Sequence, residues 1–230
     1  MKNIVILTGS GISAESGIAT FREQNGLWEN HRIEDVATPE AWLKNPETVL
    51  NFYNQRRQQA LAANPNYAHL ALKELEKDFN VQIITQNVDH LHEQAGSTNI
   101  IKLHGSLFSK CSDKNRAIKA EVYDNMTFGE KAPDGGYWRP DIVWFGEAVS
   151  EIENALPYFR RADACVIIGT SMQVYPAAGL TQYLPRYAEI FILDLNSPAA
   201  NNSRAKVNYI TKRATEGVDD VINLLKDKLL

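Results

Sequence analysis

The chain of 230 residues has little cysteine, no long apolar run and no excess of basic charge. Two cysteines cannot build the disulfide framework of a small secreted domain. No segment reaches the roughly 18 apolar residues that a membrane-spanning helix needs, so no membrane association is expected. The formal net charge of -4 lacks the basic surplus that is typical of nucleic-acid-binding proteins. These absences together favour a reducing, cytoplasmic location and no nucleic-acid partner.

Apolar residues make up 44% of the chain, which is enough for a sizeable core. Short apolar runs, each followed by polar or glycine-rich residues, are typical of buried parallel strands that end at ligand-binding loops. They lie at residues 4–7, 81–84, 100–103, 142–145, 164–168 and 190–193. Because helical stretches separate several of them, the pattern predicts an α/β fold with a doubly wound, parallel, Rossmann-like sheet.

Two stretches interrupt this alternation. Asn45, Pro46 and Glu47 have the pattern of a helix N-terminus, which predicts a helix that runs to about Ala63. Residues 106–139 are polar and have no strong period. We therefore expect a small inserted domain that lacks an intact zinc ribbon, formed by residues 31–70 and 106–139. The Rossmann-like domain would comprise residues 1–30, 71–105 and 140–230. Further helices are expected at residues 11–19 and 218–230.

A glycine-rich loop follows the first apolar run. Gly9, Gly11 and Ala14 match the dinucleotide-binding fingerprint, in which glycines let backbone N–H groups approach a phosphate. A tight turn between a strand and a helix would have the same pattern. No acidic residue for the ribose is evident at the end of the next strand, so an ordinary hydride-transfer domain is disfavoured.

Polar residues also follow the second and third apolar runs. Asn87 and Asp89 can hold ribose hydroxyls and a carboxamide, although Asp89 would equally suit a helix cap. His104 has the side chain whose ordinary pKa, about 6.5, suits a general base at neutral pH. The remaining histidines are interpreted as structural: His31, His69, His90 and His92.

Several ordered motifs make the chain resemble the sirtuins, the NAD-dependent protein deacylases, over nearly its whole length. They are residues 9–22, 85–89, 103–106, 139–147, 169–171 with 176–178, and Asn196. Ser10 and Ala19 stand where this family usually has alanine and proline. The resemblance implies NAD as cofactor, acyl-lysine proteins or peptides as substrates, and transfer of the acyl group to ADP-ribose. The products would be lysine, nicotinamide and O-acyl-ADP-ribose.

The resemblance also implies a role for individual residues. His104 and Asn87 would be catalytic. The residues implied to bind NAD are Gly9, Ser10, Gly11, Ser13, Phe21, Arg22, Gln86, Asn87, Asp89, Gly169, Thr170, Ser171, Asn196 and Ala214. Val143, Phe145, Gly146 and Glu147 resemble the strand and loop that pair with an extended substrate peptide.

Ala37, Tyr53 and Arg56 resemble the acyl pocket of the sirtuin subclass that removes succinyl and malonyl groups. Tyr53 and Arg56 lie three residues apart, on one face of the predicted helix. An arginine binds a carboxylate through two parallel hydrogen bonds, and a tyrosine hydroxyl adds a donor. The alternative is a surface helix that happens to carry both residues.

Most sirtuins hold a zinc ion with two Cys-x-x-Cys pairs. The matching places here carry Cys111, Lys114, Lys131 and Asp134, and a single thiol cannot supply tetrahedral zinc coordination. No zinc is therefore expected. An ion pair from Lys114 or Lys131 to Asp134 would have to replace it, together with packing of the module's aromatic residues. Those candidates are Tyr123, Phe128, Tyr137 and Trp138.

Two other functions fit the same motifs. One is NAD-dependent ADP-ribosyl transfer or NAD hydrolysis, against which Tyr53 and Arg56 argue. The other is a catalytically silent module that binds NAD or acyl-lysine, against which the intact Asn87, Asp89 and His104 argue. The oligomeric state is left open by the sequence.

Overall fold

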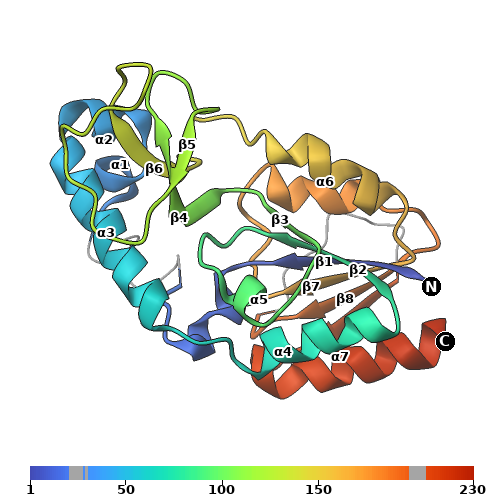
Figure 1. The fold of residues 1–230 in the computed structure, drawn as a ribbon. Helices are drawn as coiled ribbons and strands as arrows, with labels where there is room; N and C mark the ends of the chain where they lie inside the picture. The colour runs from blue at the N-terminus through green and yellow to red at the C-terminus, as the bar shows by residue number, and fades with distance from the viewer. Residues whose placement is uncertain (21–27, 29–30, 197–205) are drawn as a thin grey trace.

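The computed structural model describes residues 1–20, 28, 31–196 and 206–230. At its centre lies a parallel six-stranded sheet with the order β3-β2-β1-β7-β8-β9 (Figure 1). This sheet confirms the predicted Rossmann-like α/β fold. Its strands are β1 (Asn3–Thr8), β2 (Asn80–Thr85), β3 (Ile100–Lys102), β7 (Ala164–Ile168), β8 (Glu189–Leu193) and β9 (Val207–Ile210).

Helices cover both faces of this sheet (Figure 1). Successive side chains of a strand point to opposite faces, so Ile4 and Ile6 join one apolar layer whereas Val5 and Leu7 join the other. On the first face pack α4 (Tyr67–Glu74) and α7 (Ala214–Leu229). On the second pack α6 (Glu151–Arg160) and η4 (Ala177–Tyr183). The short η3 (Leu75–Lys77) precedes β2, and α5 (Leu91–Gln94) follows β2.

A small module beside the sheet has its own apolar core, which includes Phe52, Leu107 and Trp144. Its helices are α1 (Ile33–Val36), α2 (Pro39–Lys44) and α3 (Pro46–Ala62). They pack on an antiparallel sheet of β5 (Lys119–Glu121), β4 (Gly105–Ser112) and β6 (Trp138–Ile142). Helix α3 begins where the sequence predicts, because the Asn45 side chain accepts a hydrogen bond of 3.2 Å from the Thr48 N–H.

The structure corrects several predicted elements. Residues 142–145 are no strand of the large sheet: Ile142 ends β6, and Ile142 and Trp144 face the core of the small module. The predicted helix at residues 11–19 is replaced by two 3-10 turns, η1 (Ser10–Ile12) and η2 (Ala14–Ser16). Gly17 ends the second turn with a left-handed φ of 85°. Helix α7 begins at Ala214 rather than at residue 218.

The small module is held by other contacts than the predicted ion pair. The Asp134 carboxylate accepts hydrogen bonds from the Ser112 hydroxyl (2.8 Å) and the Gly136 N–H (3.0 Å). Among the described residues no salt bridge joins Lys114 or Lys131 to Asp134. The bonds from Gly136 and Ser112 lower the pKa of that carboxyl, and the Lys114 charge adds to this shift. The Lys131 ammonium lies 3.0 Å from the Tyr137 ring centroid. Phe128 stacks on that same ring at 4.9 Å.

We keep the predicted division into two domains as a proposal. Helix α4 begins at Tyr67 and packs in the core of the large sheet, so the boundary after the first inserted segment would fall near residue 66. No helix within the described ranges combines the length and the apolar character needed to cross a membrane.

Candidate active site

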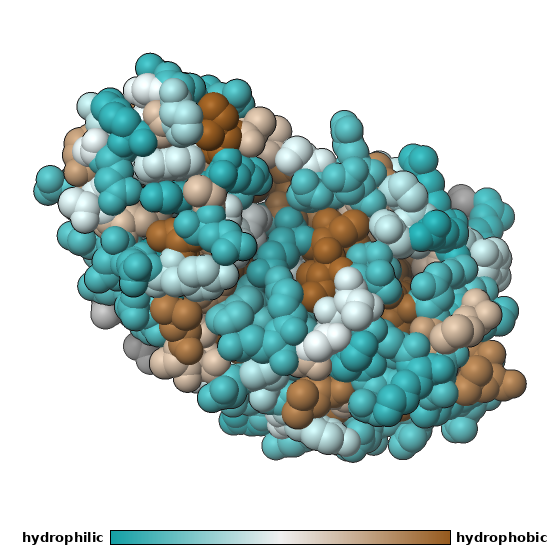
Figure 2. All heavy atoms as spheres, viewed as in Figure 1, coloured by the Kyte–Doolittle hydropathy of each residue, from teal (hydrophilic) through white to brown (hydrophobic). Residues whose placement is uncertain are grey.

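A cavity of about 1100 Å³ opens at the carboxyl ends of the parallel strands, where the large sheet meets the small module. Figure 2 shows an indentation between the two lobes of the molecule. Phe21 and Arg22 lie outside the described residues. All the other predicted site residues line the cavity: Gly9, Ser10, Gly11, Ser13, Ala37, Tyr53, Arg56, Gln86, Asn87, Asp89, His104, Val143, Phe145, Gly146, Glu147, Gly169, Thr170, Ser171, Asn196 and Ala214.

The two glycine motifs pack backbone against backbone. The Gly11 N–H donates a hydrogen bond of 2.9 Å to the Gly169 carbonyl oxygen. A Cβ atom on Gly11 would lie 2.6 Å from the Gly169 Cα, and Gly169 itself has a left-handed φ of 61°. A side chain at either position would push apart the two loops that follow β1 and β7. The glycines therefore expose a bare backbone surface to the cavity, as a phosphate cradle requires.

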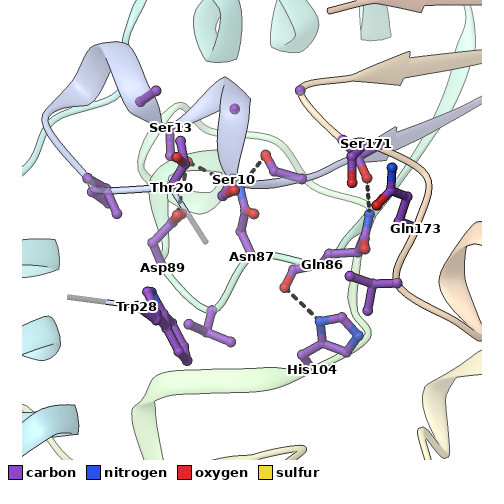
Figure 3. Close-up of a pocket in the computed structure, with 18 of the residues that line it drawn as sticks. Ser10, Ser13, Thr20, Trp28, Gln86, Asn87, Asp89, His104, Ser171 and Gln173 are labelled. Atoms are coloured by element: carbon purple, nitrogen blue, oxygen red, sulfur yellow. Dashed lines mark hydrogen bonds between the residues drawn. The ribbon is translucent and has the colours of Figure 1, made fainter. Parts of the chain in front are cut away.

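Ser13, Asn87 and Asp89 form a buried polar cluster next to this loop (Figure 3). The Ser13 hydroxyl donates to Asp89 Oδ2 (2.9 Å), and Asn87 Nδ2 donates to Ser13 Oγ (3.1 Å) and to the Gly9 carbonyl (3.1 Å). Asp89 Oδ1 accepts from the Leu91 N–H at 3.1 Å, so the residue also caps α5. Burial raises the pKa of Asp89, although these hydrogen bonds oppose the shift.

His104 follows β3, and a single hydrogen bond sets its tautomer. Its Nδ1 lies 3.0 Å from the Gln86 carbonyl oxygen (Figure 3). Because a carbonyl only accepts, Nδ1 must carry the proton and Nε2 the lone pair. Burial lowers the pKa of His104, and the bond to Gln86 partly opposes this shift. The imidazole is therefore neutral at neutral pH and able to accept a proton at Nε2.

Tyr53 and Arg56 line the cavity from α3, on the side of the small module. Tyr53 is fully buried, and its hydroxyl oxygen accepts a hydrogen bond of 3.1 Å from the Trp144 indole N–H. Burial raises the pKa of Tyr53, so the hydroxyl keeps its proton at neutral pH. The Arg56 guanidinium lies 4.3 Å from the Trp28 ring centroid and is 7% exposed. Ala37, small and buried, adds the third wall of the predicted acyl pocket.

The loop after β6 forms the opposite edge of this pocket. The Val143 N–H donates to the His104 carbonyl and the Phe145 N–H to the Ala37 carbonyl, both at 3.0 Å. The Glu147 carboxylate accepts from Arg139 (2.7 Å) and from the Trp144 N–H (2.8 Å). Its oxygens are thus used to hold the turn, although the residue lines the cavity.

Sequence reasoning missed Trp28 and Trp144, which also line the cavity. Trp144 lies within the motif of residues 139–147 but was given no role of its own, and only tertiary packing shows that Trp28 faces Arg56 and Trp144 faces Tyr53. At the far end of the cavity, Asn196 is exposed after β8 and Ala214 begins α7.

The remaining cysteine of the zinc-ribbon positions is buried. Burial raises the pKa of the Cys111 thiol to about 11, so the sulfur keeps its proton at neutral pH. Over the ranges that the structure describes, no three His, Cys, Asp or Glu side chains gather closely enough to hold a metal ion.

Comparison with known proteins gives concordant matches. Residues 9–176 match the model of the Sir2 family. The chain is 51% identical to an NAD-dependent protein deacylase of Bacteroides thetaiotaomicron over 232 residues, covering 98% of each chain. A solved complex of a Sir2 homologue with NAD superposes with a TM-score of 0.86 at 37% identity, covering 99% of this chain and 90% of that one. A complex of Sir2 with a p53 peptide and NAD+ superposes with a TM-score of 0.82 at 28% identity, covering 98% and 94%.

Proposed function

Because the chain belongs to the Sir2 family and is an NAD-dependent protein deacylase, we propose that it prefers acyl groups that carry a carboxylate, succinyl and malonyl, over acetyl. The observation that carries this proposal is the placement of Tyr53 and Arg56 together in the buried wall of the cavity. Its substrates would be acyl-lysine side chains of proteins or peptides, in keeping with the peptide complex of the related Sir2 protein.

The cavity fits NAD by its shape and its polar groups. The bare backbone of Gly9, Gly11 and Gly169 would face the diphosphate. Gln86, Asn87 and Asp89 would hold the nicotinamide ribose and carboxamide, and Asn196 and Ala214 the adenosine. When bound, NAD would supply the ribose carbon open to the acyl carbonyl oxygen, nicotinamide as the leaving group, and the ribose hydroxyl that carries the acyl group in the product.

The residues of the chain would position the ligands in the cavity and take up a proton from the ribose. The Ser13 hydroxyl donates its proton to Asp89, so its oxygen is left to accept from the Asn87 amide nitrogen. The Asn87 amide oxygen would then be the atom that faces a ligand. His104, protonated at Nδ1 by its bond to Gln86, accepts the proton of a ribose hydroxyl at Nε2. Holding the acyl-lysine carbonyl against the cofactor is mainly a matter of orientation, and rigid walls favour it.

The acyl preference follows from the charge and shape of the pocket. The Arg56 guanidinium lies 4.3 Å from the Trp28 ring centroid, and its planar fork of N–H donors can bind a carboxylate through two parallel hydrogen bonds. The protonated Tyr53 hydroxyl offers a further donor. An acetyl group has no atom to match these donors, whereas a succinyl group brings both the charge and the acceptors.

Exchange of Arg56 for methionine tests this proposal. Arg56→Met should lower kcat/KM for a succinyl-lysine peptide by about 10- to 100-fold, because a charge-assisted bidentate interaction is lost. Deacetylation should be spared or raised. Tyr53→Phe should act in the same direction more weakly, since it removes one donor and keeps the ring.

The measurement compares succinyl-, malonyl- and acetyl-lysine peptides with and without NAD. Gln55→Met, which places the same new side chain on the exposed side of α3, is the matched control. Equal losses for acetyl and succinyl peptides in Arg56→Met would contradict the proposal. Mass spectrometry of the products separates deacylation, which yields O-acyl-ADP-ribose, from ADP-ribosyl transfer to protein.

A further inference from the structure

A hydrogen bond between two buried side chains lies at the base of the acyl pocket. The Trp144 indole Nε1 lies 3.1 Å from the Tyr53 hydroxyl oxygen, and the two side chains are 2% and 0% exposed. An indole N–H can only donate, so the Tyr53 oxygen must act as the acceptor. The hydroxyl proton is then directed away from Trp144. Without the indole N–H, the same hydroxyl would be able to rotate between donor and acceptor roles.

Trp144 is itself held from several sides. Its backbone N–H donates to the Glu147 carboxylate at 2.8 Å. The Arg139 guanidinium lies 3.3 Å from the centroid of its ring and bonds to that same carboxylate at 2.7 Å. Trp42 packs on the indole at a centroid distance of 6.0 Å. A side chain fixed in this way can hold a neighbouring group in one orientation, which is what a preorganised site needs.

We propose that Trp144 is a positioning residue that presents the Tyr53 hydroxyl to the acyl chain as a donor only. This inference rests on the proposed preference for acidic acyl groups. A donor fixed in advance favours an acyl carboxylate, which accepts hydrogen bonds, and gives no benefit to a methyl group. The ion pair of Arg139 and Glu147, at the end of the small sheet, thereby contributes to acyl selectivity although neither side chain needs to contact the acyl group.

The experiment removes the indole N–H and keeps an aromatic ring at position 144. Trp144 is replaced by phenylalanine and, as an isostere, by an alanine that carries benzothiophene, in which sulfur takes the place of the N–H. The readout is the ratio of kcat/KM for succinyl-lysine to kcat/KM for acetyl-lysine peptides, because a general loss of structure cancels in that ratio. Both replacements should lower the ratio roughly fivefold, the effect of one neutral hydrogen bond. The lower kcat/KM should come from a higher KM for the succinyl peptide, with kcat little changed. This is the pattern for an interaction that is made equally in the ground state and the transition state.

A double-mutant cycle and a control separate positioning from packing. In the Tyr53→Phe background, loss of the Trp144 N–H should leave the ratio unchanged, because the hydroxyl that it orients is gone. Trp138→Phe is the matched control: it removes an indole from the same small module, one whose ring lies 5.0 Å from the Lys110 ammonium rather than beside Tyr53. Its ratio should equal that of the wild type.

Two results would overturn the inference. If the wild type prefers succinyl and Arg56→Met abolishes that preference, while the benzothiophene variant keeps the full ratio, the pocket is as proposed and Trp144 has no positioning role. If the wild type itself shows no preference for succinyl over acetyl, the proposed acyl specificity falls and the role of Trp144 falls with it.

Discussion

At the scale of single residues, two protons in the cleft are positioned by hydrogen-bond partners of one kind. A carbonyl oxygen can only accept, and an indole N–H can only donate. The Gln86 carbonyl fixes the tautomer of His104, and the Trp144 indole fixes the role of the Tyr53 hydroxyl. In both pairs the orienting group lies on a different element from the group that it orients. The chemical competence of these side chains is therefore a property of their neighbours as much as of their own ordinary pKa values.

His104 should determine the acid side of the pH profile. A base must be neutral to accept a proton, and burial lowers the pKa of His104, so kcat/KM should fall only below pH 6.5, the residue's ordinary pKa. His104→Ala should reduce deacylation by about 10²–10⁴-fold while NAD binding remains measurable. Steady-state kinetics across pH and calorimetric titration with NAD provide the check. Wild-type turnover by the alanine variant would remove His104 from the proposed mechanism.

At the scale of elements, helix α3 serves two neighbours at once. Tyr53 and Arg56 line the cavity, whereas Asn54 and Arg57 face the small sheet and the segment that leads to Met126. The buried Arg57 donates to the Leu107 carbonyl (2.6 Å) and to Asn54 Oδ1 (2.8 Å). Burial lowers its pKa to about 10, so the guanidinium stays charged at neutral pH and is satisfied by neutral oxygen acceptors.

Loss of Arg57 should therefore destabilise the small module. Arg57→Met removes the side-chain donor of the buried Leu107 carbonyl on β4 and leaves Asn54 Oδ1 with the Met126 N–H alone, which should cost about 2–4 kcal/mol of unfolding free energy. Urea denaturation followed by circular dichroism measures the change. Gln55→Met, with the same new side chain on the exposed face of α3, should stay within about 0.5 kcal/mol of the wild type. Similar stabilities for the two variants would show that Arg57 is not a structural link.

At the scale of the whole molecule, the small module is proposed to fold without a metal. The Ser112–Asp134 hydrogen bond connects the two segments that a zinc ribbon would join. The Phe128–Tyr137 stack and the bond from Arg57 to Leu107 support the rest of the module. Elemental analysis of protein purified without added metal should find no stoichiometric zinc, and chelators should change neither activity nor melting temperature. One zinc per chain, lost together with activity on chelation, would contradict this expectation.

Sequence patterns predicted those elements whose environment is simple. Strands β1, β2, β7 and β8 are buried on both faces, so each is an apolar run, interrupted only in β2 by the buried Gln82. In the edge strand β9 and in strand β4 of the small sheet, polar residues are mixed with apolar ones, and neither strand was predicted. Most predicted cleft residues directly follow a strand, whereas Ala37, Tyr53 and Arg56 were predicted from the resemblance to an acyl pocket. Trp28, Trp144 and Arg57 were not predicted, because their roles depend on contacts between segments far apart in the chain.

The two faces of α3 also bear on how such a protein changes over generations. Tyr53 and Arg56, which are proposed to select the acyl group, alternate along one helix with residues that anchor it, and the hydrogen bonds of Tyr53 and Arg57 go to different partners. Substitutions on the cavity face can accumulate while the anchoring face keeps the helix in place, because sites without shared partners act nearly independently. A lineage carrying this arrangement is free to exchange one kind of acyl substrate for another by single steps, without passing through an unfolded ancestor.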